Sequence, residues 1–141
     1  MESSNSTIDK CELIDFPVVL DARGALTFIE QERHVPFDLK RVYYLYDVPS
    51  GATRAAHAHK NLQQVYICLS GSMDVHLDDG ENKKTIHLNR PHYGLYLCPG
   101  IWRYIDNFSS NSVLMVLTNE LYDEQDYIRD YDEYLRFRGL S

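Results

Sequence analysis

Short apolar runs alternate with turn residues along most of the chain. β-Branched and aromatic runs with turns every 8–12 residues predict strands of an all-β sandwich or barrel. Asp79-Gly80 lies between two such runs and predicts a hairpin. The expected strands are about 16–20, 26–30, 41–48, 65–69, 73–77, 84–88, 93–97, 102–107 and 113–118.

The C-terminal part of the chain has a different period. Acidic residues at 123, 124 and 126 suit the first turn of a helix, and apolar residues then recur at helical spacing up to Leu135. We predict one amphipathic helix at about 123–138, packed on the barrel. Its acidic side chains are expected to be solvated and to lie away from the chemistry.

Length and net charge indicate the number of domains and the kinds of ligand that the protein can bind. A chain of 141 residues fits a polar N-terminal segment (1–12) followed by a single domain (13–141). The formal charge of -7 argues against a nucleic-acid partner, because phosphate neutralisation needs surplus Lys and Arg. A small phosphate-bearing ligand needs only a few local cations and stays possible.

Cellular location is expected to be the cytoplasm, without a membrane partner. No apolar run approaches the ~20 residues of a membrane helix, and the first ten residues lack a signal-peptide pattern. Cys11, Cys68 and Cys98 are odd in number and lack CxxC spacing. They predict reduced thiols, with Cys68 and Cys98 packed in the core.

A His-x-His pair carries the most specific chemical signal. His57 and His59 lie two residues apart in an extended segment, so both rings face the same side of a sheet. Near neutral pH each imidazole can accept or donate a proton. Beside an arginine that stabilises an enolate, such a pair suits proton transfer at a carbon next to a carbonyl.

The spacing around this pair resembles the first motif of the cupin superfamily, a double-stranded β-helix or jelly-roll barrel. The positions of the first motif hold Gly51, His57, His59, Gln64 and Gly71, and those of the second hold Gly94, Pro99, Gly100, Arg103 and Asn107. Metal-binding cupins carry Glu and His where this chain has Gln64 and Arg103. Gln64 carries no negative charge, and the fixed cation of Arg103 would repel a divalent ion that has only two imidazoles to bind it, so we expect no metal and no cofactor.

Further segments are similar to the nucleotide-sugar 3,4-ketoisomerases, over about residues 16–134. The matching segments are 36–44, His57-Ala58-His59-Lys60 with Arg54, 94–96, 122–124 and 126–129. The resemblance implies a metal-independent homodimer with exchanged strands, acting on dTDP-4-keto-6-deoxy-glucose. It also implies a place in the synthesis of 3-amino sugars of bacterial surface polysaccharides such as O-antigen.

The same resemblance implies roles for single residues. Arg54 is expected to bind the pyrophosphate with help from Lys60, and Tyr43 to donate to a sugar oxygen. Arg23 and Arg103 match sugar-pocket positions at which the family varies, so the C4 configuration of the product is left open. Ala55-Ala56 departs from a Gly-aromatic pair that is frequent in relatives.

The implied reaction moves a ketone from C4 to C3 through an enediolate. We assign His57 to the carbon-bound proton and His59 to the oxygens. One alternative is a dTDP-sugar 3,5-epimerase, which uses a His–Asp dyad, although no Asp is obviously placed to pair with His57. Two others are a non-enzymatic small-molecule-binding cupin and a metal-dependent oxygenase.

Overall fold

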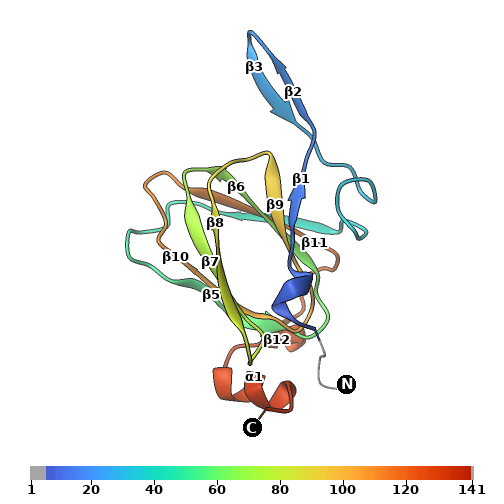
Figure 1. Ribbon diagram of the computed structural model, residues 1–141, viewed down its shortest axis with the longest axis vertical. Coiled ribbons are helices and arrows are strands. Elements are labelled where there is room, and N and C mark those ends of the chain that lie inside the picture. The colour runs from blue at the N-terminus through green and yellow to red at the C-terminus, as the bar shows by residue number, and fades with distance from the viewer. Residues whose placement is uncertain (1–5, 141) are drawn as a thin grey trace.

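The alternating runs form two five-stranded antiparallel sheets that pack face to face (Figure 1). The computed structural model describes residues 6–140. The first sheet contains, in spatial order, β1 (Leu13–Asp15), β9 (Tyr93–Leu97), β6 (Gln64–Ser70), β11 (Val113–Thr118) and β4 (Arg41–Leu45). The second contains β12 (Tyr127–Ile128), β5 (Arg54–His59), β10 (Trp102–Asp106), β7 (Met73–Asp78) and β8 (Lys83–Leu88).

From β4 onward the chain crosses repeatedly between the two sheets, which confirms the predicted jelly roll. The main core fills the space between the sheets, with Tyr66, Leu95 and Leu114 from one and Val75 and Ile105 from the other. Alternating side chains of each strand supply this core, as expected for half-buried sheets. A second apolar cluster, which includes Phe37 and Ile67, covers the outer face of the first sheet.

A two-stranded hairpin projects from the barrel (Figure 1). It consists of β2 (Val18–Asp21) and β3 (Gly24–Thr27), which pair only with each other among the described residues. Every residue of β2 is exposed, and the side chain of Leu20 keeps 74% of its surface accessible. The hairpin therefore buries little apolar surface within its own chain.

The predicted helix at 123–138 is wrong in its extent. The segment forms a 3-10 turn, η2 (Glu124–Asp126), then β12, and only then the helix α1 (Tyr131–Phe137). Tyr127 and Ile128 pair with β5, and this use of their backbone groups interrupts the helix. Asp130 then caps α1 by accepting a hydrogen bond from the Glu133 backbone N–H.

The polar N-terminal segment is partly built into the barrel. A 3-10 turn, η1 (Ile8–Lys10), buries Ile8, whose backbone N–H donates to the Asp79 carboxylate at 3.0 Å. Cys11 is also buried, and its sulfur lies 3.9 Å from that of Cys98. All three cysteines are free and buried. Residues 1–5 of the segment lie outside the described part.

No helix between residues 6 and 140 is both long and apolar enough to cross a membrane.

Candidate active site

The histidine pair lies on β5, whose two neighbours are β10 and β12. The ring centroids of His57 and His59 are 4.7 Å apart, with the planes at 85° to one another. This confirms that both rings lie on one side of the strand. His59 has no accessible surface and His57 keeps 8%. Most of the water around both imidazoles is therefore excluded.

A bulge precedes the pair in β5. The register with β10 shifts between Arg54 and His57, and Ala55 takes a φ of 63°, in the left-handed region. Bulges re-aim side chains near active sites, and a residue with a Cβ is strained at positive φ. The bulge places Arg54 at the mouth of a cavity whose wall includes His57.

Behind the histidines lies a buried network around Arg103. Its guanidinium donates to the Gln64 side-chain oxygen at 2.5 Å and to the Tyr66 hydroxyl at 3.0 Å. Two further bonds reach the Ile101 carbonyl oxygen, each at 3.2 Å. The Gln64 amide in turn donates to the Tyr43 hydroxyl at 3.1 Å. Arg103 is thus fully buried among neutral hydrogen-bond partners.

These contacts do not suit the metal site of metal-binding cupins. Two of the four ligand positions hold Gln64 and Arg103, which bond to each other. Arg103 also pairs in register with His57, so its fixed positive charge lies beside the remaining imidazoles. A divalent cation would meet two neutral ligands and one repelling guanidinium.

The buried cation also affects the histidines. Burial, with smaller contributions from Arg103, His59 and Arg129, lowers the pKa of His57 to about 2. Burial and Arg103 lower the pKa of His59 to about 4, although Asp126 opposes this effect. Both rings are therefore neutral near pH 7, and each has a nitrogen that can accept a proton.

Two cavities meet at this site. The first, of about 470 Å³, is lined by Arg41, Tyr43, Arg54, His57, Tyr66 and Arg129, among others. The second, of about 440 Å³, includes His59 and Asp126. Arg41, Tyr122 and Tyr127 line both. The Tyr127 ring packs beside both histidines, with centroids 5.0 Å from His57 and 4.4 Å from His59.

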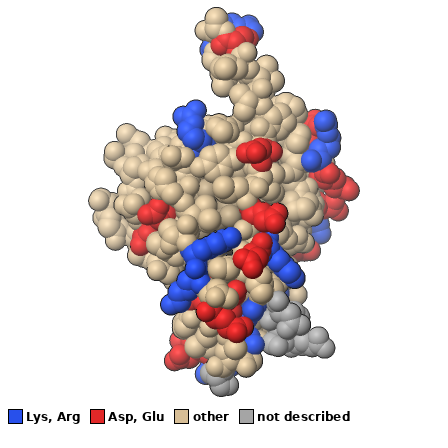
Figure 2. Space-filling view, viewed as in Figure 1, with Lys and Arg blue, Asp and Glu red and all other residues tan. Residues whose placement is uncertain are grey.

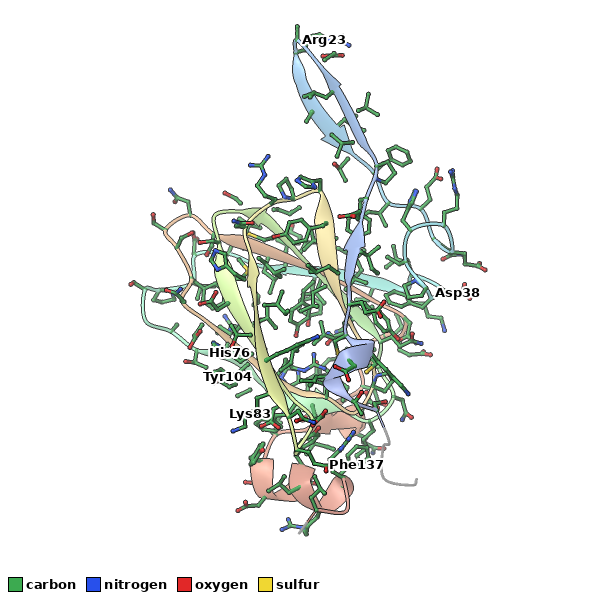
Figure 3. All side chains as sticks on the ribbon, viewed as in Figure 1. Arg23, Asp38, His76, Lys83, Tyr104 and Phe137 are labelled. Atoms are coloured by element: carbon green, nitrogen blue, oxygen red, sulfur yellow. The ribbon has the colours of Figure 1, made fainter. Side chains whose placement is uncertain are left out.

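The structure brings together some of the residues that the sequence singled out. Tyr43, Arg54 and His57 line one cavity. Arg103 lies behind His57, outside the residues that line either cavity, and Lys60 lines neither. Arg23 lies at the tip of the hairpin, far from α1, which carries Phe137 (Figure 3). Its side chain is 90% exposed and pairs with Asp21 at 2.7 Å.

Four residues of the site were missed. Arg41 lies two positions before Tyr43 in β4, so strand alternation could have placed it on the same face. Asp126, Tyr127 and Arg129 belong to a segment that we had expected to be a helix. Asp126 lies 3.4 Å from His59, so the expectation that the C-terminal acidic residues lie away from the chemistry was wrong for this residue.

Known proteins are similar to this chain over nearly its whole length. The family model described as FdtA: WxcM-like, C-terminal matches residues 9–139. A TDP-4-oxo-6-deoxy-alpha-D-glucose-3,4-oxoisomerase from Aneurinibacillus thermoaerophilus is 45% identical over 126 residues, covering 89% of this chain and 91% of the relative.

Solved structures of sugar 3,4-ketoisomerases are also similar to this chain in fold and sequence. QdtA, a sugar 3,4-ketoisomerase from Thermoanaerobacterium thermosaccharolyticum in complex with TDP, superposes with a TM-score of 0.92 at 44% identity. The match covers 94% of this chain and 97% of QdtA. A dTDP-4-dehydrorhamnose 3,5-epimerase from Bacillus anthracis matches with a TM-score of 0.74 at 15% identity, over 89% of this chain and 81% of the epimerase. That likeness shows a common fold alone.

Proposed function

The chain belongs to the FdtA, WxcM-like C-terminal family, and on that premise we propose that it is a sugar-nucleotide 3,4-ketoisomerase. Its substrate would be dTDP-4-keto-6-deoxy-glucose, and its product the 3-keto isomer, a precursor of 3-amino sugars for surface polysaccharide. The observation that carries the proposal is the neutral, perpendicular pair of His57 and His59 beside the buried Arg103 cation.

The pair suits the two kinds of proton movement in this isomerisation. His57 removes the proton from C3 of the sugar, and the electron pair moves to O4 to give an enediolate. A proton passes from O3 to O4, and His57 then returns its proton to C4 while the ketone forms at C3. The positive field of Arg103 favours the negative charge of the enediolate, because the intervening site is largely dry.

Cations at the first cavity suit an anionic ligand. Arg41, Arg54 and Arg129 line it together with His57. Arg129 is already paired with Glu124 at 2.9 Å, whereas Arg54 is exposed at the cavity mouth. We assign Arg54 to the pyrophosphate, where a guanidinium can bind two oxygens at once. Tyr43 would donate to a sugar oxygen, and Lys60 would add a charge outside the cavity wall.

A homodimer with exchanged strands would explain the projecting hairpin. An isolated two-stranded hairpin is marginally stable in water, and this one exposes Val19, Leu20 and Leu26. In Figure 2 the charged side chains gather at its tip, while the stem below is covered by uncharged ones. We propose that the stem packs on a second copy and brings Arg23 to that copy's sugar pocket.

The test is NMR of dTDP-4-keto-6-deoxy-glucose incubated with the protein in D2O. The proposal requires the ketone to move to C3, and deuterium appears at C4 to the extent that the proton held by His57 exchanges with D2O before it is returned. The C4 configuration is read from the same spectra. The His57→Asn variant should bind the nucleotide yet lose turnover, because only the proton acceptor is removed. Near-normal turnover of that variant would exclude the mechanism.

The contact between Asp126 and His59 also fits a second candidate, a dTDP-sugar 3,5-epimerase with a His–Asp dyad. The same experiment separates the two activities. Deuterium at C5 with the ketone still at C4 would indicate epimerisation.

A further inference from the structure

Asp126 is the last residue of the 3-10 turn η2, and its side chain faces His59 of β5. Its Oδ2 atom lies 3.4 Å from Nδ1 of His59, and 12% of its side chain is exposed. The distance is longer than a strong hydrogen bond, but catalytic hydrogen bonds are often long before substrate binds. His59 is fully buried, and Asp126 is the carboxylate placed to accept a hydrogen bond from its Nδ1–H.

The carboxylate is fixed by groups other than the histidine. Oδ1 accepts from the backbone N–H of Asn61 at 2.9 Å and from its side-chain amide at 3.2 Å. Oδ2 accepts from the backbone N–H of Leu62 at 3.1 Å, and the backbone carbonyl of Asp126 accepts from the backbone N–H of Lys60 at 3.0 Å. Burial alone would raise the pKa of Asp126, but the adjacent His59 and the hydrogen bonds from Asn61 and Leu62 lower it. The group is therefore a fixed anion near pH 7.

A fixed anion at Nδ1 selects one tautomer of the imidazole. The proton stays on Nδ1, and Nε2 is left as the acceptor. Both ring nitrogens of His59 are buried without a hydrogen bond among the described residues. Nδ1 nevertheless has the Asp126 carboxylate 3.4 Å away, so Nε2 is the nitrogen left to act on a substrate. Tyr127 covers the ring at 4.4 Å between centroids and helps to exclude water.

The two histidines differ in the charges around them. His57 faces the cations Arg103 and Arg129 and the neighbouring His59. His59 faces Arg103 and Arg41 but also Asp126, and its pKa of about 4 lies above that of His57, about 2. A protonated ring is therefore easier to form at His59, although both rings rest in the neutral form.

We propose that Asp126 is a positioning residue that fixes His59 as the Nδ1–H tautomer and stabilises its imidazolium during transfer of a proton between O3 and O4. In this step the O3–H bond breaks and its proton moves to Nε2. The same proton then forms the O4–H bond, and the electron pair left on O3 becomes part of the new C3 ketone. His59 ends neutral, so the step balances. The inference rests on the proposed isomerase function.

Asp126→Asn tests this role. An amide cannot stabilise the imidazolium as a carboxylate does, so kcat should fall by about 100-fold or more while KM changes by less than about threefold. Exchange of the C3 hydrogen with D2O should fall much less than ketone migration, since His57 is intact. Asp132→Asn, which removes the same charge from an exposed site on α1, should keep wild-type rates.

A double-mutant cycle separates this role from a structural one. If Asp126 acts through His59, adding Asp126→Asn to His59→Asn should lower kcat by less than about threefold further. Multiplicative losses would overturn the proposal, as would near-normal kcat in Asp126→Asn alone.

A measurement on the unmodified protein avoids any folding defect of the variants. NMR of ¹⁵N-histidine-labelled protein should show His59 as the Nδ1–H tautomer, assigned by the signal lost in His59→Asn. The Nε2–H tautomer would overturn the inference. This result does not depend on isomerase activity, whereas failure of the proposed function would leave the wild-type protein itself without ketone migration.

Discussion

The Arg103 guanidinium donates to the Gln64 side-chain oxygen at 2.5 Å in a part of the barrel where neither residue has accessible surface. The partner is neutral, so the positive charge of Arg103 is not cancelled at the adjacent histidines. Burial, together with this charge, lowers the pKa of both imidazoles and keeps them unprotonated well below neutral pH.

Gln64→Glu should therefore change the pH dependence of the reaction. The new carboxylate would pair with Arg103 and weaken its field, so the pKa values of His57 and His59 should rise. Since the proposed mechanism uses the neutral rings, the acid limb of kcat/KM should move to higher pH, which a pH–rate profile measures. Gln63→Glu adds the same charge one residue earlier and should leave the limb in place. An unmoved limb in Gln64→Glu would contradict the role of Arg103.

Folding stability should also depend on the buried histidines. The unfolded rings take up protons near pH 6.5, whereas folded His59 does so only near pH 4. The unfolded state therefore binds more protons than the folded state between about pH 4 and 6.5. The free energy of unfolding should have its full value above about pH 6.5 and decrease as the pH falls towards 4. The loss due to His59 should reach about 3 kcal/mol. Urea unfolding at several pH values should show a shallower decrease in His59→Gln, and an equal slope would argue against the lowered pKa.

Complementation between two inactive variants can test the exchange of the hairpin. If Arg23 enters the partner's site, Arg23→Ala and His57→Asn should each have low activity as homodimers. After mixed refolding, each heterodimer would contain one site with both native residues, so about a quarter of wild-type activity should return. No recovery, with both variants folded and mixed, would place Arg23 in its own subunit's site or outside any site. Full activity of the Arg23→Ala homodimer would show that Arg23 does not contribute to the sugar pocket.

The strained bulge predicts a stabilising substitution. Ala55 has a φ of 63°, which glycine adopts without the steric cost of a Cβ. Ala55→Gly should raise the free energy of unfolding by about 0.5–1 kcal/mol, the steric relief exceeding the entropy that glycine loses on folding. Ala56→Gly is a matched control outside the left-handed region and should destabilise. Thermal or urea unfolding measures both, and a destabilised Ala55→Gly would show that the bulge is not strained.

The sequence was sufficient for the features that depend on local pattern. Alternation along short runs predicted the strands that contain Tyr43 and Arg103, and the spacing of two residues predicted that His57 and His59 share a face. The turn at Asp79-Gly80 likewise joins β7 and β8 as expected.

Local pattern failed where a distant segment determines the structure. Residues 123–128 have helical periodicity, but pairing of Tyr127 with His59 draws the chain into the second sheet. No spacing rule brings Asp126 beside a histidine 67 positions earlier. The sequence also did not predict that the hairpin projects from the barrel, and the second copy that we propose to cover Leu20 belongs to no local pattern.

The pairing of β12 with β5 also bears on the timing of synthesis. β5, with both histidines, is translated well before the barrel is complete, but the strand beside it and the carboxylate behind His59 come only after β11. A ribosome-bound chain that has reached β11 would hold the histidine pair without Asp126 and Tyr127. Catalytic competence should therefore appear late, once residues 124–128 have left the exit tunnel and docked.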